Sequence, residues 1–160
     1  MRGAALFGMA IAFAAGPAAA APRLTEPAIR AFVARQESAW NRGDVRAWAA
    51  THAPDAVFVD QARNNQNGVT PMGVSDLATA TAQARRFFGG AKVHETSTIA
   101  RIEIAPDGRS ARVFSQDVSR IETRGRPART LCAESLETVI LAGGRILSRG
   151  QTDTTIRCPR

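Results

Sequence analysis

Three glycine-containing turn signals divide the second half of the sequence into four long segments of strand-forming residues. The signals are Asp107-Gly108, Gly125-Arg126 and Gly143-Gly144, and such dipeptides are typical of tight turns between antiparallel strands. The segments span approximately 93–105, 110–123, 128–141 and 146–157. Each is about twice the usual strand length of roughly 5–6 residues. Because twist accumulates along a strand, we expect this sheet to curve around other elements.

The first half of the sequence carries helical patterns. Thr25 is a suitable N-cap for a first helix that ends near Asn41-Arg42-Gly43. Asp44 is predicted to cap a shorter second helix, and Ser75 a third helix that Gly89-Gly90 ends. The inner face of the first helix is predicted from helical spacing: Ala28, Ile29, Phe32, Val33, Gln36 and Trp40. That of the third comprises Leu77, Ala80, Ala84, Phe87 and Phe88.

Two segments separate the second and third helices. Residues 56–60 are β-branched and aromatic and too few for a helix, so they are predicted to form a strand. The segment 61–73 is rich in Asn, Gly and Pro and is predicted to be a loop. The order of these predicted helices and strands along the sequence predicts an α+β domain. Its strongly curved antiparallel sheet, a four-strand meander plus one short strand, is wrapped on the N-terminal helices.

Opposite charges give a first register for the meander. With Asp107-Gly108 at the tip of a hairpin, Glu103 faces Arg112 and Glu95 faces Arg120. With Gly125-Arg126 at the next tip, Glu122 faces Arg129 on the same side of the sheet. Cross-strand pairs of opposite charge stabilise a sheet. We therefore predict that this face is exposed to solvent.

The opposite face is predicted to be concave and apolar, with a polar patch midway. Its apolar residues are Ile102, Ile104, Ala111, Val113, Leu136 and Ile140. The patch contains Thr98, Asp117 and Glu134, and this register places Asp117 directly across from Glu134. A third hairpin with Gly143-Gly144 at its tip pairs the last two segments. It places Arg149 opposite Thr138, Gln151 opposite Leu136 and Asp153 opposite Glu134.

Acidic groups on an apolar wall are costly unless they are hydrogen-bonded, paired or in a wet cavity. One interpretation is therefore a pocket, with Asp117, Arg149 and Gln151 as ligand contacts. The alternative is a one-residue bulge that turns part of a strand outward.

A motif near the end of the first helix resembles that of a known superfamily. Asn41-Arg42-Gly43-Asp44-Val45, followed by 55–60 (DAVFVD), is similar to the N-x-G-D-h…D-A-h-h-x-D pattern of nuclear transport factor 2-like proteins, where h is apolar. The chain resembles the SnoaL-like polyketide cyclase and ketosteroid isomerase branch, over nearly all of residues 21–160. The resemblance implies a cystatin-like cone, although proteins with this fold perform many functions.

The resemblance also implies roles for individual residues. Asp60 falls at the position of the general base of ketosteroid isomerases, and Gln36 at that of their oxyanion-binding tyrosine. The partner aspartate corresponds to Glu134 in the predicted register, or to about Glu137 when counted back from Gly143. In the alternative interpretation Asp60 caps a loop. The absence of the tyrosine argues against steroid-type isomerisation.

The tryptophans and histidines have two interpretations each. Trp40 and Trp48 are core residues at helical spacing, or line the floor of a ligand pocket. His52 is expected near the end of the second helix and His94 on the concave face of the sheet. With Asp60 they could form a metal triad or a dehydratase-like pair, but no close spacing supports this. We predict no metal and no cofactor.

The first twenty residues are predicted to be a signal peptide cleaved after Ala20. Arg2 precedes an apolar stretch, Ala4–Ala15, and Ala18–Ala20 has the small residues of a cleavage site. A retained membrane anchor is the alternative. Export to the periplasm or outside the cell favours a disulfide between Cys132 and Cys158. The alternative is a buried thiol and a separate thiol near the C-terminus.

The sequence has 21 Lys and Arg against 14 Asp and Glu. The arginines are scattered and not interleaved with aromatic residues, which argues against nucleic-acid binding. We predict an exported domain at residues 21–160, with no membrane association, that binds a small apolar or partly polar molecule. The first alternative is a cofactor-independent isomerase, lyase or cyclase with Asp60 as base and Glu134 or Gln36 stabilising an enolate. The second is a homodimer formed through exposed Val118, Leu131 and Val139.

Overall fold

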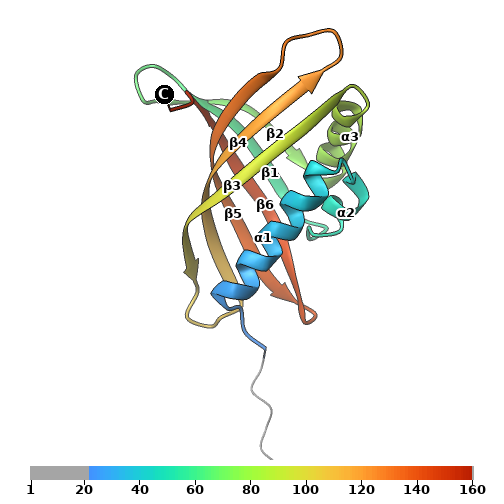
Figure 1. Ribbon diagram of the computed structural model, residues 1–160. Coiled ribbons are helices and arrows are strands. Elements are labelled where there is room, and N and C mark those ends of the chain that lie inside the picture. The colour runs from blue at the N-terminus through green and yellow to red at the C-terminus, as the bar shows by residue number, and fades with distance from the viewer. Residues whose placement is uncertain (1–21, 160) are drawn as a thin grey trace, which may run out of the picture.

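The computed structural model describes residues 22–159 and consists of one curved sheet with three helices against its concave side (Figure 1). Along the sheet, the strand order is β2-β1-β6-β5-β4-β3. Strands β1 and β6 are parallel, and all other neighbours are antiparallel. The elements are α1 (Glu26–Asn41), α2 (Val45–Ala49), β1 (Val57–Arg63), β2 (Val69–Asp76), α3 (Leu77–Phe88), β3 (Ala91–Ile104), β4 (Ser110–Thr123), β5 (Arg129–Ala142) and β6 (Arg145–Ile156). The predicted α+β fold is confirmed, with a six-stranded mixed sheet.

The helices begin where the sequence supplies capping groups. Helix α1 follows Thr25 and has a proline in its first turn. The Asp44 side chain accepts a hydrogen bond from the Ala47 backbone N–H and caps α2. Helix α3 differs from the prediction, because Asp76, not Ser75, is its N-cap and accepts from the Thr79 N–H at 2.8 Å.

The prediction of a loop over 61–73 was wrong. Strand β1 continues to Arg63, and β2 pairs with it as a hairpin. The Asn64 side chain organises the intervening turn by accepting from the N–H groups of Gln66 and Gly68. Pro71 and Gly73 led to the loop assignment. Both are tolerated in β2 because it is an edge strand with a free side.

The four meander strands begin and end within about two residues of the predicted positions. Glycines with positive φ occupy the predicted turns, at +67° for Gly108 and +73° for Gly125. The predicted pair of Glu103 and Arg112 is confirmed, with a 2.5 Å contact between carboxylate and guanidinium. Turn chemistry is local, and it therefore located the strand ends well.

Beyond that first pair, the predicted register was wrong in two places. A bulge between Ile99 and Arg101 places Glu95 opposite Ser119 instead of Arg120. The loop 124–128 pairs Ile121, not Glu122, with Arg129. A shift of one residue exchanges the two faces of a strand. The prediction of which side chains face the concave side and which face outward is therefore wrong over most of β5 and the first half of β3.

The register shift moves several predicted residues away from the concave face. Glu134 lies opposite Gln116, not Asp117, and pairs with Arg63 on the outer face. Leu136 and Ile140 share the outer face of β5. On β3, His94 and Thr98 are exposed. The alternative of a bulge is therefore correct for this part of the sheet.

A second bulge sets which residues of β6 face inward. Val139 pairs with Ser148 and Glu137 pairs with Gln151, so Arg149 and Gly150 form an irregularity opposite Thr138. Asp153 consequently lies opposite Ser135, not Glu134, and Gln151 opposite Glu137, not Leu136. Arg149 is exposed and pairs with Asp55 instead of facing a pocket.

The predicted dimer surface is not formed as expected. Val139 is fully buried. Val118 and Leu131 are exposed, but their registers, Val118 with Cys132 and Ser119 with Leu131, place them on opposite faces of the sheet. They do not make one apolar patch on the outer face.

The hydrophobic core fills one end of the cone. Its buried residues come from the segment before α1, from α1 and from two central strands: Leu24, Ile29, Phe32, Ala111, Val113, Val139 and Leu141. A smaller buried cluster of Ala56, Phe58 and Ala80 lies under α3. The space between the two clusters contains the cavity described below.

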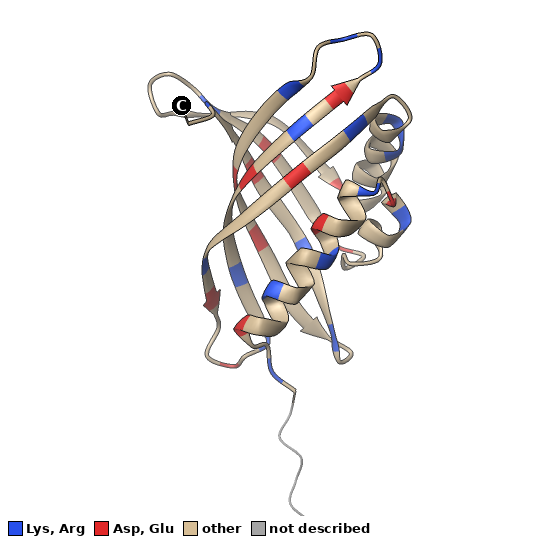
Figure 2. Cartoon of the chain, viewed as in Figure 1, with Lys and Arg blue, Asp and Glu red and all other residues tan. Residues whose placement is uncertain are grey.

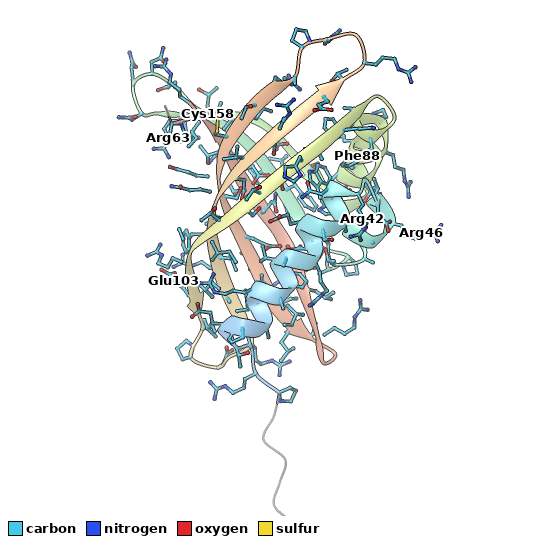
Figure 3. The ribbon with its side chains drawn as sticks, in the orientation of Figure 1. Arg42, Arg46, Arg63, Phe88, Glu103 and Cys158 are labelled. Carbon is cyan, nitrogen blue, oxygen red and sulfur yellow. A yellow bond between two sulfur atoms is a disulfide. The ribbon has the colours of Figure 1, made fainter. Side chains whose placement is uncertain are left out.

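The disulfide between Cys132 and Cys158 is present, with a Cα–Cα distance of 5.2 Å. It attaches the C-terminal segment to β5, at the end of the molecule where Arg63 lies and away from Phe88 (Figure 3). The predicted signal peptide falls outside the described residues. Within residues 22–159, no helix is both long and apolar enough to span a membrane.

Candidate functional site

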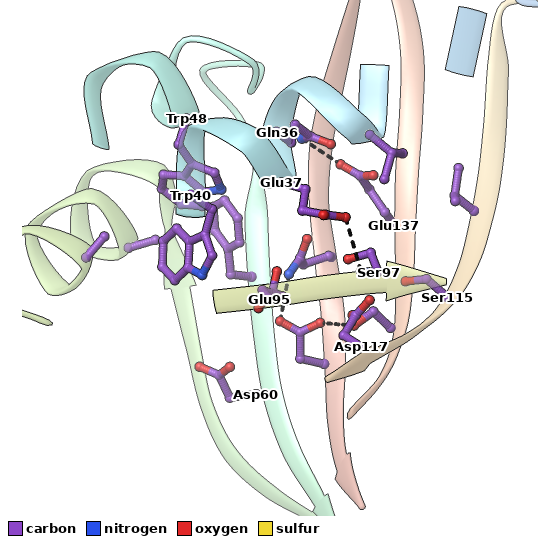
Figure 4. Close-up of a pocket in the computed structure, with 18 of the residues that line it drawn as sticks. Gln36, Glu37, Trp40, Trp48, Asp60, Glu95, Ser97, Ser115, Asp117 and Glu137 are labelled. Carbon is purple, nitrogen blue, oxygen red and sulfur yellow. Dashed lines mark hydrogen bonds between the residues drawn. The ribbon is translucent and has the colours of Figure 1, made fainter. Parts of the chain in front are cut away.

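A cavity of about 320 Å³ lies between the concave face of the sheet and the three helices (Figure 4). Its lining has two distinct parts. One part is aromatic and consists of Trp40, Trp48, Phe58 and Phe87. The other carries six carboxyl groups from α1 and five strands: Glu37, Asp60, Glu95, Asp117, Glu137 and Asp153. Figure 4 shows the tryptophans at one side of the cavity and Glu137 and Asp117 at the other.

The aromatic side chains pack on one another. The Trp40 and Trp48 ring centroids are 5.4 Å apart, and Trp40 is stacked on Phe87 with an interplanar angle of 5°. Phe58 lies 5.5 Å from Trp48. Such offset contacts stabilise the cluster beyond the burial of its area. The two tryptophans thus pack against their neighbours, as core residues do, and also line the cavity.

Gln36 and Glu137 form a buried pair between α1 and β5. The Gln36 Nε2 donates to Glu137 Oε1 at 2.9 Å and also approaches Thr51 Oγ1 at 3.3 Å. Both side chains are less than one-tenth exposed. Burial raises the pKa of Glu137 to about 7, although hydrogen bonds from Ser148 and Gln36 oppose the rise. Glu137 can therefore exchange a proton near neutral pH.

Ser135 connects two further carboxyl groups. Its hydroxyl contacts Asp117 Oδ2 and Asp153 Oδ1, while Gln151 Nε2 donates to Asp153 Oδ2 at 2.7 Å. A hydroxyl has one hydrogen and can donate to only one acid, so the other acid must carry a proton to complete both bonds. Burial is the main cause of the raised pKa of Asp153, while the hydrogen bonds from Ser135 and Gln151 oppose the rise.

Glu95 and Glu37 complete the acidic part of the lining. The Ser119 hydroxyl donates to Glu95 at 2.7 Å, and Glu37 accepts from the Ser97 backbone N–H at 3.1 Å. The pKa of Glu95 is raised to about 7, mainly by burial and to a smaller extent by the nearby charges of Asp117, Asp153 and Glu37, while the hydrogen bond from Ser119 opposes the rise.

Asn41 fixes the position of β3 beside α1. Its side chain accepts from the Glu95 N–H at 2.7 Å and donates to the Glu95 carbonyl oxygen at 2.8 Å. Asn41, the first residue of the sequence motif, therefore positions the part of β3 that carries Glu95 into the cavity lining.

Asp60 lies in the cavity lining but is exposed, so it stands at the mouth. It is at the bulge of β1 and next to Asp153 in the parallel register with β6. Figure 4 shows it apart from the other labelled acids. This position gives it access both to solvent and to a molecule in the cavity.

The structure brings most of the sequence-predicted residues together. Those that line the cavity are Gln36, Trp40, Trp48, Asp60, Asp117 and Gln151. Glu134 and Arg149 lie elsewhere, for the register reasons given above. Glu137, the alternative to Glu134, faces the cavity.

The histidines do not take part in a polar site. His52 is buried against the rings of Trp48 and Phe58, and burial lowers its pKa to about 4. It is therefore neutral at physiological pH. Within residues 22–159, no group of three or more His, Cys, Asp or Glu side chains is arranged to hold a metal ion.

Sequence reasoning missed Glu37, Glu95 and Ser135. Glu95 was assigned to the solvated face because of its apparent pairing with Arg120, and only the bulge at Ile99/Arg101 corrects this. Counting from Gly143 was the one signal that pointed to Glu137. No comparable signal identified Ser135.

No protein-family model and no curated protein matches the sequence. Solved structures do match the fold. A conserved protein from Planctomyces limnophilus has a TM-score of 0.67 at 15% identity, covering 82% of this chain and 95% of its own. A ketosteroid isomerase-like protein from Erwinia carotovora atroseptica has a TM-score of 0.64 at 14% identity, covering 81% and 95%. An NTF-2-like protein of unknown function from Shewanella oneidensis has a TM-score of 0.56 at 16% identity, covering 79% and 95%.

Proposed function

We propose that this chain, which has the nuclear transport factor 2-like, cystatin-like cone fold, binds a small molecule in its cavity. The observation that carries the proposal is the cavity itself, which separates the two core clusters and is lined by buried polar groups. Ligand sites are typically concave, about 300–1,000 Å³ in volume, and largely apolar with a few fixed polar groups. This cavity meets that description at the lower end of the range.

The polar groups are held in fixed positions before any ligand arrives. Gln36 and Glu137 orient one another across α1 and β5, and Ser135 holds Asp117 and Asp153. Such preorganisation reduces the entropy lost on binding. Burying these acids lowers stability, so a role in binding explains them better than a role in folding.

A fragment screen by ligand-observed NMR tests this proposal with matched variants. Ser115→Phe would place a ring in the cavity, whereas Gln116→Phe places the same ring on the outer face of the same strand. We expect fragments to bind the wild-type chain and Gln116→Phe but not Ser115→Phe. Fragments that bind all three proteins equally, or none of them at all, would contradict the proposal.

A second function, proton transfer, is favoured by the presence of Asp60 at the mouth of the cavity that contains Gln36 and Glu137. The Asp60 carboxylate would remove a proton from a carbon next to a carbonyl. The C–H electron pair would move to the carbonyl oxygen, and the enolate would accept a hydrogen bond from Gln36 or neutral Glu137. Asp60 would then return the proton to carbon.

Deuterium exchange from D₂O into cyclohexanone and acetophenone, followed by NMR, tests this second function. We expect exchange above the buffer rate, lost in Asp60→Asn and retained in Asp107→Asn, whose aspartate lies in an exposed turn. Exchange that survives in Asp60→Asn would exclude Asp60 as the base.

We also propose that the domain is exported after cleavage behind Ala20, and the disulfide of Cys132 and Cys158 supports this. Mass spectrometry of the protein recovered from the periplasm or medium should give a chain that begins at Ala21. Recovery of the full-length chain from the cytoplasm would contradict export.

A further inference from the structure

The charges that line the cavity all have the same sign. Six of the 14 acidic residues of the sequence face it, and no lysine, arginine or histidine is among the described lining residues. Elsewhere the chain has an excess of arginine, and the acids of the outer face are paired with it. Figure 2 shows acidic residues in the middle of the sheet and many basic residues in turns, at strand ends and on the helices. The cavity is therefore a negative site in a positively charged protein.

The aromatic part of the lining provides a second, independent indication. The faces of Trp, Tyr and Phe rings attract cations, with Trp the strongest of the three. Here Trp40 and Trp48 line the same cavity as the carboxyl groups. Rings combined with carboxylates are suited to a head group that is both cationic and partly apolar.

One acidic oxygen lacks a partner. Asp117 Oδ2 is bonded to Ser135, but the buried Oδ1 accepts no hydrogen bond within residues 22–159. An unsatisfied buried acceptor is costly, particularly on an ionised group. Asp117 also lines the cavity. Its free oxygen offers a place for a donor or a positive charge from a ligand.

We propose that the ligand is an organic cation, an amine or a quaternary ammonium compound, held between Asp117 and the rings of Trp40 and Trp48. This inference rests on the proposed binding function and specifies its ligand class. The carboxyl groups come from six different elements and do not converge as a metal site, whereas an organic cation spreads its charge over a larger volume. The apolar part of the ligand would occupy the aromatic side of the cavity.

Binding of a cation should depend on pH. The titratable groups that face the site are Glu37 from α1, Asp60 from β1, Glu95 from β3, Asp117 from β4, Glu137 from β5 and Asp153 from β6. Burial raises the pKa of Glu95 and Glu137 to about 7, and a bound cation would favour their ionised forms. Cation binding should therefore release protons and become tighter as the pH rises through 7.

Two matched pairs of probes test the inference by isothermal titration calorimetry. Choline is compared with 3,3-dimethylbutan-1-ol, which has a carbon in place of the nitrogen, and 2-phenylethylamine with 2-phenylethanol. We expect the cation of at least one pair to bind about tenfold tighter or more than its neutral partner at about pH 8.5. Choline does not titrate, so any change in its affinity with pH arises from the protein. Its affinity should fall about tenfold by roughly pH 5.5.

Two variants connect the effect to the site. Asp117→Asn keeps the shape of the side chain but removes its charge, and should lower the affinity for the cation about tenfold or more. Glu122→Gln removes a charge from the exposed face of the same strand and should leave the affinity within about twofold. If Asp117→Asn proves unfolded by circular dichroism, Trp40→Leu replaces it, with the same loss expected.

The outcomes separate this inference from the binding proposal. Neutral probes that bind as tightly as the cations, or an Asp117→Asn variant that folds and retains full affinity, would overturn the cation inference and leave the fragment-screen result standing. Failure of all four probes would also overturn it. Only a fragment screen that fails as well would remove the binding proposal.

Discussion

The two faces of the sheet handle acidic residues in opposite ways. On the outer face, acids have arginine partners: Glu134 with Arg63, Glu103 with Arg112 and Glu122 with Arg120. On the inner face, five carboxyl groups line the cavity together with Glu37 of α1, without a basic residue among the described residues around them. Glu134 and Glu137 are three positions apart on β5, yet one is an ordinary surface group and the other is fully enclosed.

This difference separates exposed acids that are paired with arginine from buried acids that have no basic partner. An exposed ion pair contributes only about 0–1 kcal/mol to stability. A buried acid without a cation destabilises the fold or stays protonated. The inner acids therefore cannot be explained as stabilising elements. Their hydrogen bonds to Gln36, Ser119 and Ser135 position them, which is what a binding or proton-transfer site requires.

The largest expected effect comes from removing the bulge that turns Asp153 inward. Gly150 has a φ of +102°, and a Cβ there would lie 1.8 Å from the Val57 carbonyl oxygen. Gly150→Ala should therefore cost more than about 4 kcal/mol of unfolding free energy, or prevent folding. Gly90→Ala is the control, because a Cβ there meets no other atom within 4 Å. Urea denaturation that gives Gly150→Ala wild-type stability would show that this bulge does not fix the inner face.

The next largest expected effect is a pH dependence of the unfolding free energy that arises from Glu137 on the inner face. The folded-state pKa of Glu137 is about 7, above its ordinary value of 4.5. Between these values the folded chain keeps a proton that the unfolded chain has lost. The contribution of Glu137 to stability is therefore full below pH 4.5 and is lost as the pH rises through 7, by about 3 kcal/mol. In Glu137→Gln this part of the decline should be absent, whereas the part that arises from Glu95 should remain.

The same measurement includes two internal controls. Glu134→Gln should give a pH profile parallel to that of the wild type, because Glu134 is on the outer face. His52, with a lowered pKa of about 4, adds stability as the pH rises from 4 to 6.5. That contribution is common to all three proteins and cancels in the comparison. Parallel profiles for Glu137→Gln and the wild type would contradict the assignment of the two faces.

The smallest effect is the loss of an outer ion pair at constant pH. Glu134→Gln removes the partner of Arg63, and both side chains are about two-fifths exposed. The free energy of unfolding should fall by less than about 1 kcal/mol, and the difference should shrink further in high salt. A loss of several kcal/mol in chemical denaturation would mean that the outer pairs are structural elements after all.

The sequence predicted the elements better than the pairing between them. Asp107-Gly108 and Asp44 act through local backbone geometry and hydrogen bonds, so their positions could be recognised directly. Register is different, because a single extra residue, such as the one in the bulge at Ile99/Arg101, exchanges the two faces of a strand. The charge pattern did not reveal this bulge, because the sequence allows Glu95 to be paired with Arg120 as readily as Glu103 with Arg112.

The candidate site could be predicted only in part, for the same reason. Gln36, Asp60 and the two tryptophans precede the register errors, and they do line the cavity, while their roles there stay predictions. Glu134 was placed on the wrong face because the loop 124–128 shifts β5 by one residue. Strand β2 was missed because Pro71 and Gly73 are poor residues for a central strand but acceptable ones at an edge.

The most direct test of the central claim is an NMR titration of the side-chain carboxyl carbons, with and without choline. If the inner acids form a cation-binding cavity, Glu95 and Glu137 should titrate near pH 7 in the free protein, and choline should lower both pKa values. Carboxyl groups on the outer face should not respond to choline. Ordinary titration of Glu95 and Glu137 near 4.5, unchanged by choline, would contradict the account.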